Sequence, residues 1–335
     1  MNEIFFRTGI GKFIRDTWLR RQSRRLHNHK LRQVTELVVQ VADPLIRNAD
    51  DYQKILQDPI DEATKYFTQL IDAIPGPVDL SRKGYESDHT VKFLFASPEE
   101  LEEVVRISPE LRYLRDKGYT GEVVALLTMT LRERTVYGYV QDGETFQRDV
   151  AQQAVDFVDH RIVAPETTMD SVKNQLVEKG LSILATTAME IITGLKAKKA
   201  ELREQKEYLG AMLRIMGGRK IAWESFTPLD PAQLEEITKA EQRLVEVKTE
   251  LAELQNQLDG PEDALNFLKT VVSRPSEELL IQEYPLHLNW KRIRVSGKDE
   301  TEGNEISLAE LSNRSGAIKR SAVLVTLVLG EAAMS

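Results

Sequence analysis

Residues 234–258 read LEEITKAEQRLVEVKTELAELQNQL. Apolar residues recur in this stretch at alternating spacings of three and four, namely Ile237, Ala240, Leu244, Val247, Leu251, Leu254 and Leu258. This heptad spacing keeps one apolar seam of an α-helix turned toward a partner helix. The stretch therefore predicts a long helix that packs along another helix.

The partner helix is predicted just before it in the chain. Apolar side chains follow a similar spacing there, at Leu181, Leu184, Ala188, Ile191, Leu195, Leu202, Leu209, Met212 and Met216, with Lys198 and Gln205 at the polar steps. We expect Gly217-Gly218 to end this helix and Asp230-Pro231 to cap and begin the next. Two long helices joined by a short loop fold back on each other, which predicts an antiparallel coiled-coil hairpin between about Asp170 and Leu258, an arm about 45 Å long.

The rest of the chain predicts a helix-rich α+β fold. Helical spacing over Leu31–Leu45, which Pro44 should end, and over Asp61–Ile74 indicates helices before the boundary Pro75-Gly-Pro77. Between this boundary and the hairpin we expect a strand at Val91–Phe95, a helix from the Ser97 cap to about Lys117, and paired strands at Glu122–Leu131 and Thr135–Gln141. The stretch Thr145–Ile162 fits either a helix, by the spacing of Phe146, Val150, Ala154 and Val158, or a strand, by the alternation of Val155 and Phe157, and we favour the helix.

After the hairpin the pattern returns to β structure. The expected elements are a short helix to about Ser273, a strand with alternation from Tyr284 to Trp290 and a bulge near Arg292, a short strand or helix at Ile306–Leu311, and a buried central strand at Ser321–Leu329. The simplest architecture is one antiparallel-sheet domain split in sequence by the inserted hairpin. The predicted organisation is a basic amphipathic segment (1–33), an N-terminal helical region (34–76), the first half of the α+β domain (85–168), the hairpin (169–260) and the second half of the domain (261–335).

The composition of the chain excludes several kinds of site and segment. The chain has no cysteine, which excludes disulfides and thiolate metal sites. Its longest apolar runs, Gly180–Leu195 and Ala322–Gly330, are shorter than the roughly 20 residues of a membrane-spanning helix. No secretory signal is evident. We expect a cytoplasmic protein that is peripheral to a membrane at most.

The first 33 residues differ in charge from the rest of the chain. They hold nine basic and two acidic side chains, whereas the whole chain has a net charge of −8. The residues that mark this segment as a candidate interaction site are Phe6, Ile10, Phe13, Trp18, Arg20, Arg21, Arg24 and Arg25. It suits an amphipathic helix on an anionic membrane, a nucleic-acid arm, an organellar transit peptide, or a contact with the acidic body of its own chain or a sister subunit. Nucleic acid is the poorer partner because the acidic body repels a polyanion.

The hairpin tip is the second candidate interaction site. Arg219, Trp223 and Phe226 lie between the two helices, far along an arm that cannot reach the main core. Their aromatic and guanidinium groups either cap the hairpin locally or contact a partner, because such side chains dominate contact energetics.

No catalytic or metal motif stands out. Asp156 and His160 would share a face of the expected helix, but no third ligand accompanies them. Gly11-Lys12 lacks the other residues of a phosphate-binding loop. We therefore expect no metal and no cofactor.

Two short sequence motifs suggest a nucleotide ligand. The stretch Asp79-Leu-Ser81-Arg-Lys-Gly84 fits D-x-S-x-x-G, and Arg20/Arg24 or Arg21/Arg25 fits R-x-x-x-R. Together they resemble the motif of the PilZ family, which binds cyclic dinucleotides with arginines on the phosphates and the Asp and Ser on a barrel strand. In this chain more than fifty residues of helical pattern separate the two strings, where that family has a short gap.

Two hypotheses follow. The leading one is a non-enzymatic structural or adaptor protein that uses the hairpin for protein contact or self-association and its basic start to dock on an acidic surface. The alternative is a regulator that binds a nucleotide second messenger through the PilZ-like residues. An enzyme would require a cleft assembled without linear motifs.

Overall fold

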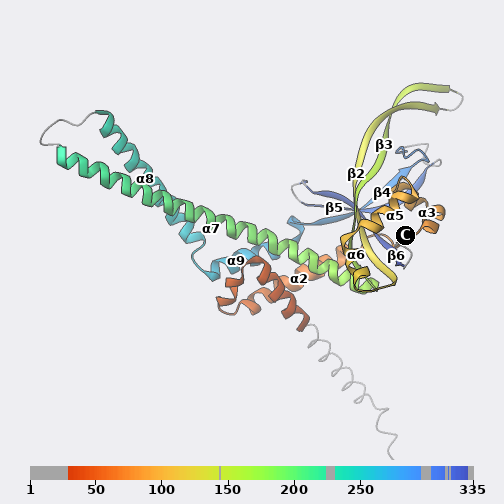
Figure 1. The fold of residues 1–335 in the computed structure, drawn as a ribbon, viewed down its shortest axis with the longest axis horizontal. Coiled ribbons are helices and arrows are strands. Elements are labelled where there is room, and N and C mark those ends of the chain that lie inside the picture. Colours follow the sequence, from red (N-terminus) through yellow and green to blue (C-terminus); the bar gives the residue numbers. More distant parts are fainter. Residues whose placement is uncertain are drawn as a thin grey trace, which may run out of the picture. The chain divides into compact units, whose positions relative to one another are not determined.

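The structure of the chain, a computed structural model, describes residues 29–142, 145–223, 231–295, 303–313, 316 and 318–330. It contains both helices and a curled antiparallel sheet (Figure 1). The chain divides into two compact units: unit 1 joins Met1–Asp61 to Ser182–Ser273, and unit 2 joins Glu62–Leu181 to Arg274–Ser335. Each unit is built from two separate pieces of the sequence.

Unit 1 is helical. Its elements are a helix over residues 29–42, η1 (Pro44–Asn48), the first half of α2 (Tyr52–Asp72), most of α7 (Met169–Trp223), α8 (Pro231–Gln257) and α9 (Pro261–Val272). The first helix stops before Pro44, as predicted, and the Asp43 carboxylate caps η1 by accepting a hydrogen bond from the Leu45 amide at 3.1 Å. Fully buried Val38, Ile46 and Leu56 belong to the core of this unit.

The predicted helical hairpin is present. α7 and α8 run side by side in opposite directions (Figure 1), and Leu202 on α7 lies in one buried cluster with Val247, Leu251 and Leu254 on α8. The expected end of the first helix at Gly217-Gly218 is wrong, because α7 continues to Trp223. Each glycine costs a helix only about 1 kcal/mol, which a 55-residue helix absorbs.

Unit 2 is organised around the sheet. Its strands are β1 (Val78–Asp79), β2 (Gly121–Asp142), β3 (Thr145–Glu166), β4 (Leu280–Leu288), β5 (Asn304–Ser312) and β6 (Lys319–Leu329). The order is β3-β2-β6-β5-β4 with antiparallel neighbours, and β1 pairs parallel to β6. β6 is central, as predicted for Ser321–Leu329, and it is buried on both faces over Ser321–Val325, whereas Val328 is 69% exposed. The short segment Ile306–Leu311 belongs to strand β5.

The two edges of the sheet are joined by the residues that follow β4. Ile293 bridges to Ala154 on β3, and Arg294 bridges to Leu288 on β4. The Val155 amide donates to the Arg292 carbonyl at 2.8 Å, which ties β3 to this segment. The predicted alternation as far as Trp290 is wrong: β4 ends at Leu288, and Arg292 adopts a left-handed φ of 61° that turns the chain back toward the sheet.

Four short helices precede β2. They are α3 (Arg82–Ser87), α4 (His89–Leu94), α5 (Pro98–Ile107) and α6 (Pro109–Asp116), and η2 (Pro275–Glu277) follows the hairpin. Apolar residues of α4, α5 and α6 join the inward side chains of β2 to β6 in one buried core. The expected strand at Val91–Phe95 is wrong, because Asp88 caps a helical turn through the Thr90 amide at 2.7 Å. A run this short fits the period of either structure.

The Ser97 cap is confirmed. Its hydroxyl accepts from the Glu100 amide at 3.3 Å, and the Glu100 carboxylate accepts from the Ala96 amide at 2.5 Å. The single helix expected to about Lys117 is instead α5 followed by α6, because Pro109 cannot continue a helix and begins a new one behind the Ser108 cap.

Two further predictions are wrong in the region of β2 and β3. The strands expected at Glu122–Leu131 and Thr135–Gln141 are one continuous strand, β2, and the helix expected at Thr145–Ile162 is its partner strand β3. Side chains four residues apart share a face in a strand as well as in a helix, so the spacing of Phe146, Val150, Ala154 and Val158 did not distinguish them. β2 pairs with β6 only over Gly121–Met129, and beyond it β2 and β3 continue as a curved two-stranded ribbon (Figure 1).

Candidate functional site

The seam of the hairpin follows the sequence pattern on α8. Ala240, Val247, Leu251, Leu254 and Leu258 are buried, and the two remaining predicted positions are half-buried. On α7, Leu195 and Leu209 pack against the same cluster as Leu202. The seam is therefore most completely buried in the part of the hairpin around Leu202 and Leu251.

Two seam positions on α7 differ from the prediction. Ile192 is buried, at 1% exposed, whereas the predicted Ile191 is 39% exposed. Lys199 rather than Lys198 lies in the seam, with its side chain only 12% exposed. Its ammonium donates to the Leu258 carbonyl at 2.9 Å, which gives the end of α8 a cationic cap while the aliphatic stem covers apolar surface.

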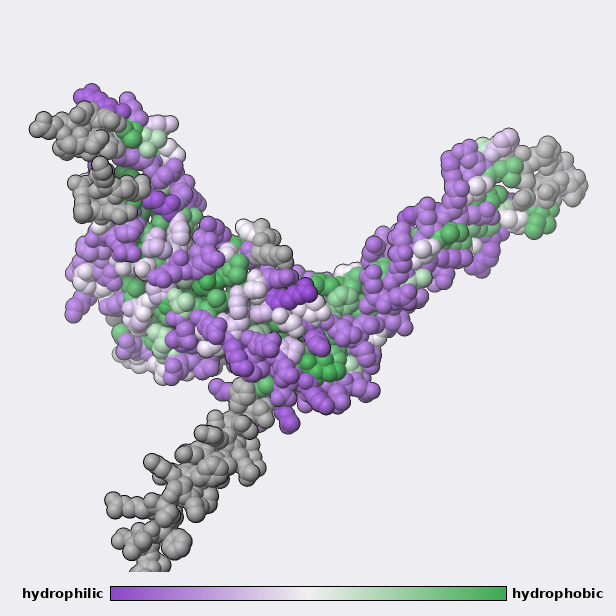
Figure 2. All heavy atoms as spheres, turned by 180° about the vertical axis from the view of Figure 1, so that it is seen from behind, coloured by the Kyte–Doolittle hydropathy of each residue, from purple (hydrophilic) through white to green (hydrophobic). Residues whose placement is uncertain are grey.

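Toward the loop, the hairpin exposes apolar side chains. We define the outer arm as Glu204–Trp223 of α7 with Pro231–Val245 of α8. Its exposed apolar residues are Tyr208 (68%), Ile215 (61%), Ile221 (77%), Leu234 (42%) and Val245 (63%). Figure 2 shows apolar surface among the charged side chains along this part of the hairpin. Single exposed apolar residues are ordinary, but several of them on one narrow element make the outer arm a candidate contact surface.

Some of these residues form a regular line on α7. Glu204, Tyr208, Met212, Ile215 and Arg219 follow one another at spacings of four, four, three and four. On a helix such residues share one face, and Met212, one of the predicted seam positions, is half-buried within it. We call this line the outer stripe.

The predicted interaction residues are only partly described. Arg219 is exposed on α7, Trp223 is the last residue of that helix with its side chain outside the described part, and Phe226 lies outside the described residues. All eight candidates from Phe6 to Arg25 also lie outside the described residues. Tyr208, Ile215, Leu234 and Val245 were not predicted as interaction residues, although the helical spacing from Tyr208 to Ile215 on α7 is present in the sequence.

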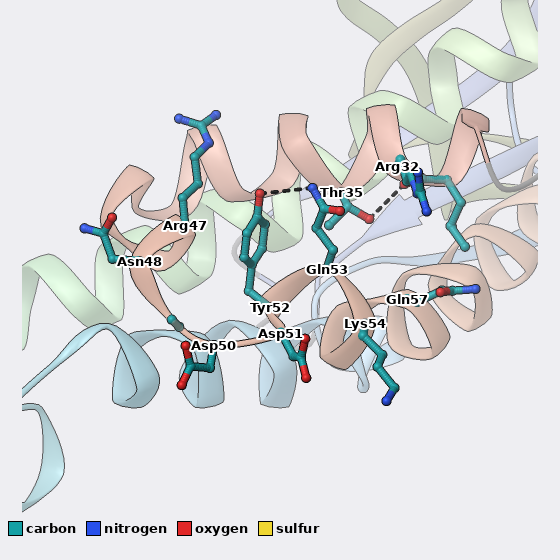
Figure 3. A pocket seen from close by; sticks show the side chains of 12 residues that line it. Arg32, Thr35, Arg47, Asn48, Asp50, Asp51, Tyr52, Gln53, Lys54 and Gln57 are labelled. Carbon is teal, nitrogen blue, oxygen red and sulfur yellow. Dashed lines mark hydrogen bonds between the residues drawn. The ribbon is translucent and has the colours of Figure 1, made fainter.

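A polar pocket of about 560 Å³ lies between the helix of residues 29–42 and the start of α2 (Figure 3). Beside it the Glu36 carboxylate accepts hydrogen bonds from the Tyr52 hydroxyl at 2.6 Å, Gln53 Nε2 at 2.8 Å and Arg47 Nε at 3.1 Å. The bond from Tyr52 is the main cause that lowers the pKa of Glu36, and the same bond raises the pKa of Tyr52. This network favours a charged Glu36 and a protonated Tyr52, and it moves both pKa values further from neutral pH, whereas a general acid or base needs a pKa near the working pH.

A second pocket, of about 430 Å³, opens at one end of the curled sheet. Its lining residues are Thr130, Leu131, Glu133, Tyr284, Arg294, Glu310, Lys319 and Ser321. Arg294 pairs with Glu133 at 3.1 Å and Lys319 with Glu310 at 2.8 Å, and Arg294 also donates to the Tyr284 hydroxyl. The two cations and two anions thus neutralise each other within the wall of the pocket.

The PilZ-like residues have local structural roles. The Ser81 hydroxyl caps α3 by accepting from the Gly84 amide at 2.9 Å, and it donates to Asp79 Oδ2 at 2.7 Å. A Cβ at Gly84 would lie 2.1 Å from the Asp79 carbonyl oxygen, so the helix start requires glycine there. The arginines of the motif lie outside the described residues.

The histidine singled out by its spacing is a structural group. His160 lies in strand β3, not in a helix, and its ring stacks on Phe95 with centroids 4.6 Å apart. Its Nε2 lies 2.9 Å from the Leu94 carbonyl, and burial lowers its pKa. Among the described residues, no group of three or more carboxylate or imidazole side chains is arranged to hold a metal.

No helix in the described ranges combines the length and apolar character needed to cross a bilayer. Compared with known proteins, the chain matches no protein-family model, no curated protein and no solved structure.

Proposed function

We propose that this protein is a non-enzymatic adaptor whose hairpin forms an antiparallel coiled coil and binds a protein partner through the outer arm. The single observation that carries the proposal is the exposure of apolar side chains there, from 42% at Leu234 to 77% at Ile221. A partner that covers these side chains would gain about 25 cal/mol of hydrophobic free energy for every Å² of apolar surface removed from water.

The base of the arm is suited to hold it in place. Lys196 forms an ion pair with Asp43 at 2.5 Å, and the Asp43 side chain is only 9% exposed. Lys199 joins α7 to the end of α8 through the Leu258 carbonyl, and it also pairs with Asp259 at 3.2 Å. A contact surface on a supported helix loses less conformational entropy on binding than one on a free segment.

The pockets support an adaptor better than an enzyme. Beside the pocket at the start of α2, Glu36 is held in its charged form by three hydrogen bonds. In the sheet pocket, both carboxylates are occupied by cations. General acid–base catalysis needs a group whose pKa lies near the working pH, and the pKa of Glu36 is lowered away from neutral pH.

Photo-crosslinking tests the docking arm. A photoreactive phenylalanine analogue in place of Tyr208 should give a covalent protein adduct in cells, and Ile215→Asp should remove that adduct because it places a charge in the apolar contact. The same analogue at exposed Glu253, near the base of α8, is the matched control and should give no adduct. Equal labelling at Tyr208 and Glu253, or an adduct insensitive to Ile215→Asp, would show that the outer arm is not a specific contact.

We also propose that residues 1–33 bind an anionic membrane surface, so that the adaptor is cytoplasmic and peripheral. The support is their nine basic and two acidic side chains in an otherwise acidic chain. Full-length protein should co-sediment with anionic liposomes, less so at high salt, whereas protein lacking residues 1–33 should not. Equal sedimentation of the two forms would remove this part of the proposal.

A further inference from the structure

We propose that the outer arm binds a second copy of this chain, with the two α7 helices packed antiparallel along their outer stripes. This inference rests on the proposed docking arm and names its occupant. The observations that carry it are the symmetry of the outer stripe, the exposure of its apolar residues and the exposed opposite charges at its ends.

When the neighbouring Ala211 is added, the outer stripe reads the same in both directions. From Glu204 the spacings to Tyr208, Ala211, Met212, Ile215 and Arg219 are four, three, one, three and four. When two antiparallel helices meet about a twofold axis between Ala211 and Met212, each residue faces the one equally far from the axis in the other copy. Such an isologous contact uses the same patch on both subunits.

The centre of the contact is apolar. Tyr208, 68% exposed, would face Ile215 of the second copy, which is 61% exposed, and the twofold axis repeats this pair. Half-buried Met212 would face Ala211, whose small side chain lets the helices approach. An aromatic or aliphatic pair of this kind at the middle of a contact supplies most of its energy.

The ends of the contact are oppositely charged. Glu204 and Arg219 are both exposed, and among the described residues neither side chain takes part in a hydrogen bond or an ion pair. They are fifteen positions apart on one helix, roughly 22 Å along its axis, so they cannot pair within one chain. In the antiparallel dimer Glu204 of each copy meets Arg219 of the other.

The charges also select the orientation. A parallel arrangement would set Arg219 against Arg219 and Glu204 against Glu204, and like charges across a helix contact are unfavourable. The stripe covers about four helical turns, so the buried area falls below the roughly 1,000 Å² of a stable interface. We therefore expect a weak, concentration-dependent dimer.

Single cysteines test the register, because the chain has none of its own. Tyr208→Cys and Ile215→Cys variants, on chains of different length, should be joined by a short bis-maleimide when mixed. Each variant alone should give little product, since homotypic positions lie about 10 Å apart along the axis. Glu253→Cys is the exposed control. Homotypic products from the single variants, with none from the mixture, would overturn the antiparallel register.

Charge reversal tests the contact without crosslinking. Arg219→Glu should weaken dimerisation in sedimentation equilibrium by roughly tenfold, since it turns two attractive pairs into repulsive ones. Glu204→Arg should do the same, and the two changes together in one chain should restore the dimer. Restoration cannot arise within one chain because the positions are too far apart. No weakening by either single change, or none restored by the pair, would contradict the proposal.

The outcomes separate this inference from the proposed function. A Tyr208 photo-adduct with a different protein, together with no cysteine product, removes the second copy and leaves the docking arm. Neither adduct nor cysteine product removes both.

Discussion

The seam of the hairpin offers the sharpest test of the fold. Leu251 and Leu234 lie on the same helix, α8, but Leu251 is 6% exposed in the seam and Leu234 is 42% exposed on the outer arm. The same substitution, leucine to alanine, therefore removes the same atoms from two different environments.

The expected magnitudes follow from burial. Leu251→Ala withdraws three carbon atoms from apolar surroundings at about 0.8 kcal/mol each, and the residual cavity adds to this loss. Truncation of a buried leucine to alanine lowers the free energy of unfolding by roughly 2–5 kcal/mol. Because a seam between only two helices can close around the cavity, we expect a loss of about 2–3 kcal/mol for Leu251→Ala. Leu234→Ala leaves no enclosed cavity and should cost less than about 1 kcal/mol.

Hydrogen exchange is the suitable assay, because the chain forms two units and global unfolding need not be two-state. Amides of α8 around Val247–Leu254 should exchange about thirtyfold to a hundredfold faster in Leu251→Ala and only a few-fold faster in Leu234→Ala. Amides of β6 in unit 2 serve as the internal control. Equal acceleration by both substitutions would show that α7 and α8 do not form the packed seam.

Three further perturbations test unit 2. Gly84→Ala should destabilise it by more than about 1 kcal/mol, because the new Cβ would lie 2.1 Å from the Asp79 carbonyl oxygen; unchanged thermal unfolding would refute this. Burial lowers the pKa of His160 below that of a free histidine, so the unfolded chain binds the proton more readily than the folded chain. The free energy of unfolding should therefore fall as the pH drops below about 6.5. In urea titrations at about pH 5 and pH 7.5, His160→Phe should reduce this difference. An unchanged slope would show that another group is responsible. Arg292 donates to the Lys92 and Phe95 carbonyls at the end of α4, so Arg292→Gln should cost about 1–3 kcal/mol and speed exchange in α4 more than in α6; equal effects on both would contradict this role.

The candidate site could be predicted only in outline. The hairpin followed from the heptad spacing, and Arg219 was selected as a proposed contact residue by its position near the tip. The residues that the structure leaves exposed, such as Tyr208 and Ile215, could not be selected that way, since a helical residue is buried or exposed according to where the partner helix lies.

The sequence by itself determined the elements whose information is local. The seam of α8, the Ser97 cap, the stop at Pro44 and the buried strand β6 each depend on a short run of residues and on one dominant period. Tertiary structure decided the elements whose sequence satisfies two periods at once. Ala154 and Val158 fit a helix by spacing, but β3 is a strand because β2 supplies its hydrogen bonds and Ile293, far along the chain, bridges to its other edge. Non-local pairing of this kind satisfies backbone groups that no local pattern encodes, and it is the physical reason that the curled sheet emerged only from the folded structure.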